Sequence, residues 1–304
     1  MKDFNYEKYR KANWDNEVLG FIAQLHEFKG KQEMFLRKTS LELEKLTVTA
    51  KMQSTKAASA LDGVNVTELR LKQLMSDKAF AKNASEQEIL GYKNSLEHMQ
   101  KEFDALPLSA ELVMQFCNEL LTYLPELGYD MQKDLENLCI NYNQLVSTGE
   151  IDPLVVIPLF VADFLDLNPF PVAKNRMALL LTNFLLLKNG YVIGKYISIE
   201  KILCEDGFNS ELSFMKNMFG TIVSAYREFE RRMRLLSGKM SAKELVERAV
   251  RTQFGEFNKR DIMELCPSIG RASVENALTQ LVNEGSIRRK GKGKATTYSI
   301  GLYD

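Results

Sequence analysis

Two cations at the start of an apolar helix are the feature of this sequence that most directly suggests chemistry. Lys174 and Arg176 both lie just before the apolar run Met177–Leu187, in the first turn of what we expect to be a buried helix. Free N–H groups and the dipole favour anions at a helix N-terminus, so cations there need an anion or a carboxylate nearby. Two interpretations follow: these side chains bind a phosphate, or Arg176 pairs with an internal acid such as Asp163 or Asp166.

The segment around these cations resembles the core motif of the Fic family (filamentation induced by cAMP), whose members mostly transfer AMP from ATP onto a protein hydroxyl. The family motif reads His-Pro-Phe-x-Asp-Gly-Asn-Gly-Arg-x-x-Arg, and residues 168–179 align to it without a gap. The agreeing positions are Pro169, Phe170 and Arg176. The departing positions are Asn168 for the histidine, Val172 for the metal-binding acid, Ala173 and Asn175 for the glycines, Lys174 for the asparagine and Leu179 for the second arginine.

The departures affect the residues to which the resemblance gives chemical roles. In the family the histidine takes a proton from the attacking hydroxyl; an amide such as Asn168 cannot, and losing a general base typically costs ~10²–10⁴-fold in rate. Val172 has no oxygen to offer Mg²⁺, so we expect no metal site. We therefore predict a regulatory or signalling pseudoenzyme with the Fic fold. The alternative is an active Fic-type nucleotidyltransferase (protein AMPylation) with a non-standard base or metal arrangement, and a third reading is a structural adaptor.

Phosphate binding is the part of the family's chemistry that the sequence still permits. Ala173 narrows the access that a glycine would give to the helix N-terminus, but it does not abolish the helix end. We take Lys174, Asn175 and Arg176 as candidate nucleotide- or phosphate-binding residues. ATP or another nucleotide is the candidate ligand, and the sequence requires no cofactor.

A second segment resembles the inhibitory motif of the family, Ser/Thr-x-x-x-Glu followed by Gly or Asn. Asp62 and Gly63 hold its last two positions, and Ala58 replaces the hydroxyl residue. In the family the inhibitory glutamate pairs with the second arginine of the core motif, which here is Leu179. We therefore predict that Asp62 has lost its partner and that the inhibitory switch is dismantled.

Helical periodicity dominates the chain and predicts a mainly α fold, an all-helical Fic-type bundle with a small C-terminal winged-helix (α+β) domain. We expect an N-terminal helical extension over 1–105, a Fic-like core over 106–236 and a winged helix-turn-helix over 239–304. Within the first two we expect a helical break near Gly30, a helix over Leu43–Ala60, and N-caps at Ser85 (with Glu88 as capping-box partner) and Ser109. Residues 131–145 read as helix, where the family usually has a β-hairpin flap.

The C-terminal pattern predicts three helices followed by two strands about a glycine-rich turn. The helices are expected at Ser241–Thr252, Lys259–Cys266 and Arg271–Glu284, and the strands at 286–290 and 295–300. This order resembles the winged-helix domains appended to many Fic proteins.

Cations in this domain suggest contact with DNA. Residues 241–304 contain 11 basic and 8 acidic residues, a balance of 11 − 8 = +3. The candidate DNA-contacting residues are Arg271, Ser273, Asn276, Arg288, Arg289, Lys290, Lys292 and Lys294. Glu275 and Glu284 on the recognition helix oppose the approach of DNA. The alternative is a docking or dimerisation domain whose cationic wing is merely solvated.

Composition restricts the remaining classes. Among 304 residues, 40 Lys and Arg balance 40 Asp and Glu, which excludes a protein that is basic over its whole surface. Apolar stretches shorter than the ~20 residues of a membrane helix predict no membrane partner. The four cysteines (117, 139, 204 and 266) lack metal-ligand spacing and favour a reducing cytoplasm, and His26 and His98 read as surface residues. A homo-oligomer and a protein target stay open.

Overall fold

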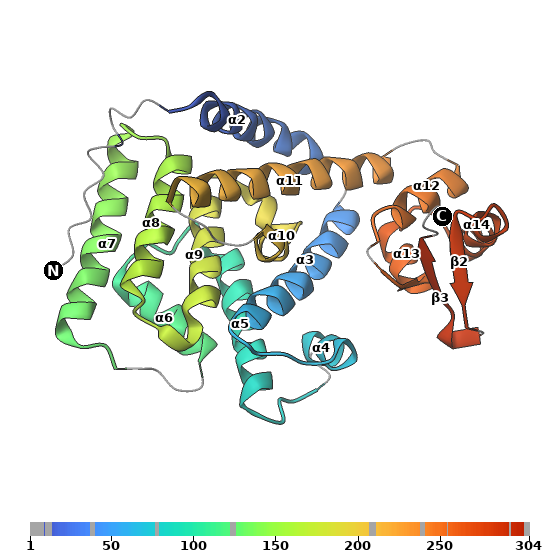
Figure 1. The fold of residues 1–304 in the computed structure, drawn as a ribbon, viewed down its shortest axis with the longest axis horizontal. Coiled ribbons are helices and arrows are strands. Elements are labelled where there is room, and N and C mark those ends of the chain that lie inside the picture. Colours follow the sequence, from blue (N-terminus) through green and yellow to red (C-terminus); the bar gives the residue numbers. More distant parts are fainter. Residues whose placement is uncertain are drawn as a thin grey trace. The chain divides into compact units, whose positions relative to one another are not determined.

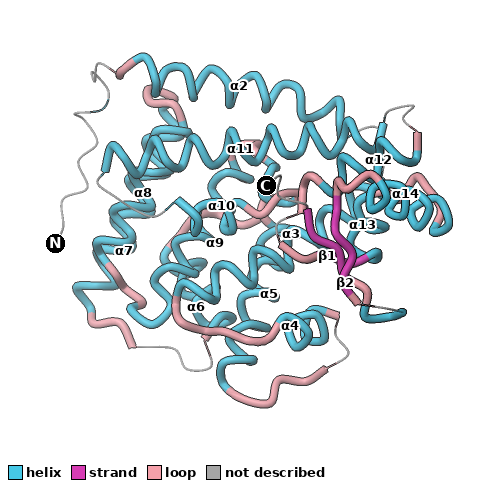
Figure 2. Tube along the Cα trace, turned by 45° about the vertical axis from the view of Figure 1, so that its right-hand side comes forward, coloured by secondary structure: helices cyan, strands magenta, loops and turns pink. Residues whose placement is uncertain are grey.

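The computed structural model describes residues 9, 14–36, 40–76, 79–121, 126–206, 211–237, 241–253, 255–291 and 293–300. The chain divides into two compact units, which we call the bundle unit (Met1–Met34 and Leu46–Tyr226) and the winged unit (Phe35–Lys45 and Arg227–Asp304). Helices make up the bundle unit, and the strands of the described residues all lie in the winged unit (Figure 2). The predicted fold class is confirmed: a helical bundle with a small sheet near the C-terminus.

The bundle unit is built from α-helices of 8 to 27 residues. They are α2 (Asn16–Leu36), α3 (Ser40–Leu61), α4 (Glu68–Met75), α5 (Ala84–Glu102), α6 (Ala110–Leu120), α7 (Tyr129–Thr148), α8 (Pro153–Leu167), α9 (Lys174–Lys188), α10 (Ile199–Asp206) and α11 (Glu211–Ser237), whose last turns belong to the winged unit. Two short 3₁₀ turns, Pro171–Ala173 and Val192–Lys195, flank α9. None of the described helices combines the length and the apolar character needed to cross a bilayer.

Helix α9 is the centre of the bundle unit. Its residues from Arg176 to Leu187 are all buried, as expected for a helix that is apolar on every side. It packs against α5, α6 and α8, and Figure 1 shows α7, α8 and α9 side by side. The N-terminus of α9 therefore lies where several helices meet.

A buried carboxylate ties α9 to the helices around it. Glu200 in α10 is fully buried and accepts hydrogen bonds from the hydroxyls of Ser54 (2.6 Å), Ser198 (3.2 Å) and Tyr92 (3.1 Å) and from Nδ2 of Asn183 (2.6 Å). Burial raises the pKa of this carboxyl, although the hydrogen bonds act in the opposite direction. The network fixes α3, α5, α9 and α10 to one another, and three of these helices carry the site described below.

Some predicted helix boundaries are correct and others are wrong. The Ser109 hydroxyl accepts from the N–H of Leu112 and caps α6, as expected. The break near Gly30 is wrong, because α2 continues through it. The predicted cap at Ser85 is also wrong. Helix α5 begins at Ala84, and the side chain of Asn83 caps it. Helix α7 confirms a helix over 131–145.

The described cysteines are free and buried. Burial raises the pKa of Cys117 and of Cys139 to about 12 and that of Cys266 to about 11, so all three are protonated at neutral pH. The side chain of Cys204 lies outside the described residues.

Besides Phe35–Lys45 and the last turns of α11, the described part of the winged unit has three helices and a small antiparallel sheet. Its elements are α12 (Ala242–Val250), β1 (Phe257–Asn258), α13 (Lys259–Leu265), α14 (Arg271–Asn283), β2 (Ile287–Lys290), a 3₁₀ turn (Gly293–Ala295) and β3 (Thr297–Ile300). The strand order is β1-β3-β2, with Arg289 opposite Tyr298 and Phe257 opposite the same residue on the other edge. Strand β1, with two residues, is too short to give an alternating pattern, so the sequence did not reveal it.

Candidate functional site

The loop before α9 places Asn168 in an unusual backbone conformation. Asn168 ends α8 with a φ of 51°, the left-handed region that asparagine tolerates better than most residues, and its N–H donates to the Phe164 carbonyl at 2.9 Å. Its side-chain Oδ1 is buried and has no hydrogen-bond partner among the described residues. Phe170 packs beside Phe164 and anchors the loop, whereas the Val172 side chain is 66% exposed.

The carboxylate of Asp62, the residue that follows α3, caps the N-terminus of α9. Ala173, at the N-cap position, makes no side-chain cap. Oδ2 of Asp62 instead accepts from the N–H of Arg176 at 3.2 Å, and Oδ1 accepts from Nδ2 of Asn175 at 2.9 Å and from its N–H at 3.4 Å. The negative charge of Asp62 thus lies where the N–H groups and the dipole of α9 favour an anion.

Arg176 completes this arrangement from inside the bundle. Its side chain is 0% exposed and donates through Nε to Oδ2 of Asp62 at 2.8 Å. Nη2 pairs with Oε2 of Glu88 at 2.7 Å and donates to the Val172 carbonyl at 3.2 Å. Nη1 is buried without a hydrogen-bond partner in the described chain. We call the three side chains Asp62, Glu88 and Arg176 the Arg176 cluster.

The end of α3 presents Asp62 to this cluster. Gly63 adopts a φ of 77°, which only glycine adopts without strain, and its N–H donates to the Ala60 carbonyl. The N–H of Val64 donates to the Ser59 carbonyl and closes the turn. Gly63 therefore ends the helix directly after the residue that reaches α9.

These contacts correct two expectations from the sequence. Asp62 has not lost its partner, because it binds the first arginine of the motif rather than the position held by Leu179. Arg176 does pair with internal acids, but they are Asp62 and Glu88, where Asp163 or Asp166 was expected. Glu88 was assigned to a helix cap, and no sequence signal links it to a residue 88 positions later.

Lys174 and the two histidines of the bundle unit lie outside the Arg176 cluster. Lys174 is partly exposed and forms no ion pair or hydrogen bond with the described residues. His26 hydrogen-bonds Asp152 through Nε2 at 2.6 Å, and its side chain is 47% exposed. His98 hydrogen-bonds Glu119 through Nδ1 at 2.8 Å. Both histidines are thus engaged with acids other than those of the Arg176 cluster.

The winged unit presents a largely uncharged helix face. Asn276, Thr279 and Gln280 of α14 are exposed, and Ser273 is half-buried. Glu275 accepts from Arg271 at 3.0 Å and pairs with Lys259, and these hydrogen bonds hold the pKa of its carboxyl below the usual range.

The acids that were expected to oppose DNA are therefore matched by cations. Glu275 has the two partners just described, and Glu284 pairs with Lys243. Neutralised in this way, both acids repel a phosphate backbone less than isolated carboxylates would.

Strand β2 carries three exposed cations. Arg288, Arg289 and Lys290 are all exposed, and Lys290 pairs with Glu256 at 2.8 Å. Lys292 lies outside the described residues, as does the side chain of Lys294. The described candidates thus occupy two elements of one unit, α14 and β2.

Comparisons with known proteins identify the fold. No family model and no curated protein matches the sequence. Among solved structures, a Fic family protein from Desulfovibrio desulfuricans G20 is similar with a TM-score of 0.58 and 16% identity, covering 95% of this chain and 97% of that one. A Fic domain containing signaling protein from Bacteroides thetaiotaomicron VPI-5482 is similar with a TM-score of 0.55 and 16% identity, covering 72% and 97%. The chain has the fold of Fic family proteins.

Proposed function

We propose that this chain is a regulatory protein with the Fic fold that binds DNA through its winged unit and does not transfer AMP. The observation that carries the proposal is the carboxylate of Asp62 on the N-terminus of α9 and on the buried side chain of Arg176. An internal anion occupies the place that a phosphate would need.

Displacing this internal anion is costly. Breaking a buried ion pair by removing one partner costs about 3–5 kcal/mol, and a phosphate at the same position would still face the carboxylate of Glu88. A ligand could regain only part of that energy through Arg176 and the backbone N–H groups. We therefore expect weak nucleotide binding or none at this helix end.

The chemistry beside the cluster also argues against transfer. Asn168, an amide, is aligned with the family's general base and cannot take a proton from a hydroxyl. Val172, aligned with the metal-binding acid, is an exposed aliphatic side chain without a ligand atom for Mg²⁺. These losses are independent of Asp62, so releasing Asp62 would not restore them.

DNA binding is supported by the distribution of charge in the winged unit. The exposed face of α14 offers amides and hydroxyls that can hydrogen-bond base edges, and Arg271 at its start is exposed. The cations of β2 can contact the phosphate backbone and fix the register of the helix. A signalling role fits this output, and the Bacteroides protein with a similar fold is described as a signaling protein.

DNA retention tests the output half of the proposal. We expect the full chain to bind random-sequence duplex DNA in fluorescence anisotropy at low salt, and the triple variant Arg288→Ala, Arg289→Ala, Lys290→Ala to bind at least tenfold more weakly. Equal affinity in the two proteins would show that the wing is merely solvated.

Transfer of labelled AMP tests the other half. Incubation with α-³²P-ATP, Mg²⁺ and a protein extract should leave no protein labelled, with the wild-type chain or with Asp62→Ala. Label transferred by Asp62→Ala alone would reveal an active enzyme held off by its own carboxylate. Label transferred by the wild-type chain would establish a nucleotidyltransferase with a non-standard base.

A further inference from the structure

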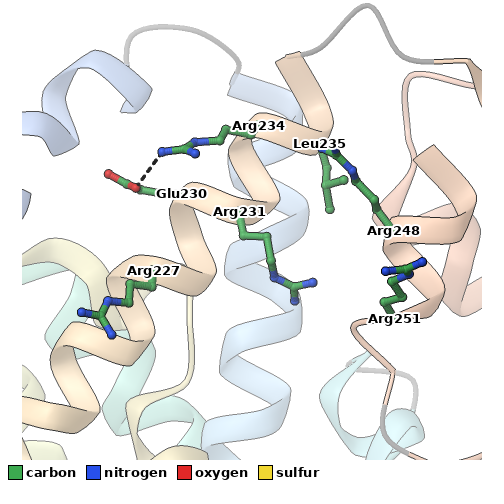
Figure 3. A pocket seen from close by; sticks show the side chains of 7 residues that line it. All are labelled: Arg227, Glu230, Arg231, Arg234, Leu235, Arg248 and Arg251. Carbon is green, nitrogen blue, oxygen red and sulfur yellow. Dashed lines mark hydrogen bonds and ion pairs between the residues drawn. The ribbon is translucent and has the colours of Figure 1, made fainter. Parts of the chain in front are cut away.

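A cavity lined by arginines lies within the winged unit, between the last turns of α11 and helix α12 (Figure 3). Its volume is about 490 Å³, within the range of small-molecule sites. The lining residues are Arg227, Glu230, Arg231, Arg234, Leu235, Arg248 and Arg251. The lining therefore contains five arginines and a single acidic residue.

Arg234 of α11 and Arg251, which follows α12, each have N–H donors beyond those in their ion pairs. Arg234 pairs with Glu230 through Nη2 alone, at 3.3 Å, and Arg251 pairs with Glu247 through Nη2 alone, at 2.7 Å. A guanidinium has five N–H donors, so each of these side chains can bind a further anion without giving up its ion pair. Arg231 is more fully engaged, since both Nε and Nη2 donate to Glu228.

Accessibility and charge both favour an anion from outside. The side chains of Arg234 and Arg251 are 73% and 74% exposed. Arg248 is exposed and forms no ion pair with a carboxylate of the described chain. The hydrogen bonds from Ser241 lower the pKa of the Glu244 carboxyl, and the charge of Arg248 acts in the same direction. Figure 3 shows the Arg248 side chain reaching toward Leu235 near the end of α11, and the side chains of Arg231 and Arg251 extending into the space between the two helices.

We propose that this cavity binds a chain of phosphates, carried either by a free polyphosphate compound or by a nucleic-acid backbone. Consecutive phosphates carry several oxygens that can accept hydrogen bonds from several guanidiniums around one space. A single carboxylate has too few oxygens to pair with all of these guanidiniums. Leu235 supplies an apolar wall and is itself 5% exposed. The site is separate from the Arg176 cluster and from the cations of β2, and it goes beyond the function proposed above.

The test uses the full chain and two phosphate probes. Inorganic triphosphate is titrated by calorimetry, and a short random-sequence DNA duplex by fluorescence anisotropy. The double variant Arg248→Ala, Arg251→Ala removes two guanidiniums of the cavity. The control is Arg260→Ala, which removes an 86% exposed arginine of the same unit that pairs with Glu264.

We expect saturable binding of triphosphate that weakens roughly tenfold or more in the double variant and stays within about twofold in the control. Arg234→Ala, on the other helix of the cavity, should weaken binding in the same direction and guards against a local effect on α12. If only the duplex is bound and loses affinity in the double variant, the phosphates come from nucleic acid.

The proposal is overturned if the double variant binds both probes as tightly as the wild-type chain does. It is also overturned if Arg260→Ala loses as much affinity as the double variant. The variants of β2 test DNA binding by the wing independently of this cavity. If the wing binds no DNA, the titration with triphosphate still decides whether the cavity binds phosphates.

Discussion

At the residue scale, Asp62 has two structural roles, one toward the backbone of α9 and one toward the side chain of Arg176. It caps the N-terminus of α9 and it neutralises the buried guanidinium of Arg176. Capping by an acid typically contributes ~1 kcal/mol, and a buried ion pair costs several times that when one partner is removed. The second role should therefore dominate the effect of a substitution.

We expect Asp62→Ala to lower the free energy of unfolding by about 3 kcal/mol, because Arg176 would retain Glu88 as its one acidic partner among the described residues. Asp62→Asn keeps one acceptor oxygen and should lose less. Urea unfolding followed by circular dichroism measures both. The control is Asp130→Ala, an exposed acid in the first turn of α7, which should cost under about 1 kcal/mol. A loss for Asp62→Ala no larger than that of the control would mean that the ion pair is energetically unimportant.

The contacts within the Arg176 cluster could not be predicted from the sequence. The motif alignment singled out Asp62 and Arg176 separately, since each has a recognisable local context. Their contact spans 114 positions and depends on how α3 and α9 pack, which no local pattern encodes. Leu179 in place of the second arginine was taken to leave Asp62 without a partner, but Asp62 contacts the helix end and the first arginine instead.

Glu200 gives a second prediction, on pH. Its pKa is raised above the ordinary value of 4.5 in the folded chain, so the folded state holds this proton at pH values where the unfolded state has lost it. The contribution of Glu200 to stability is therefore largest below pH 4.5 and declines as pH rises through the raised pKa.

We expect Glu200→Gln to remove this decline, because the amide cannot ionise. Urea midpoints at several pH values between about 4.5 and 8 should fall more steeply for the wild-type chain than for the variant. Glu126→Gln, at an exposed position, should leave the wild-type slope unchanged. Parallel slopes for wild type and Glu200→Gln would contradict a raised pKa.

At the element scale, close helix contacts depend on single glycines. Helices α5 and α6 pack against each other at Gly91, where an added Cβ would lie 2.6 Å from the carbonyl oxygen of Leu120 and 2.7 Å from that of Glu119. Backbone oxygens cannot move aside as a flexible side chain would, so the two helices must separate. Gly20 in α2, by contrast, has nothing within 4 Å of such a Cβ.

We expect Gly91→Ala to destabilise the chain by about 1–3 kcal/mol through overpacking. Gly20→Ala should instead stabilise it by about 0.5–1 kcal/mol, because alanine favours helix and meets no obstacle. Thermal unfolding of the two variants compares them directly. Stabilisation by both substitutions would show that α5 and α6 are not held at this spacing.

The sequence predicted some helices well and others poorly, and the difference depends on how strong their local signals are. Helices with a strong apolar period or a clear cap, such as α6 and α9, were expected at nearly their observed positions. Gly30 was read as a break, but one glycine costs only ~1 kcal/mol in a helix, and the packing of the rest of α2 offsets that. Two neighbouring polar residues, Asn83 and Ser85, could each cap the start of α5. Tertiary structure decides between them, and Asn83 is the cap.

At the scale of the whole molecule, charge balance makes the proposed DNA contact a local matter. The chain has 40 basic and 40 acidic residues, so no overall field attracts DNA. Binding must come from cations that touch phosphates, and each such contact releases counterions and adds about 0.9 to the slope of log affinity against log salt.

We expect a specific change in the salt dependence of DNA binding when cations of β2 are removed. Arg288→Ala with Arg289→Ala removes two exposed cations of β2 and should reduce that slope by about 2. Lys56→Ala with Lys101→Ala removes the same charge from exposed positions of the bundle unit and should leave the slope unchanged, because those lysines are not proposed to touch DNA. Anisotropy titrations from about 50 to 200 mM salt give the slopes. Since both double variants carry the same net charge, an equal reduction in the two would mean that net charge rather than the wing governs binding, and the winged unit would then lose its assignment as the DNA-contacting part of the chain.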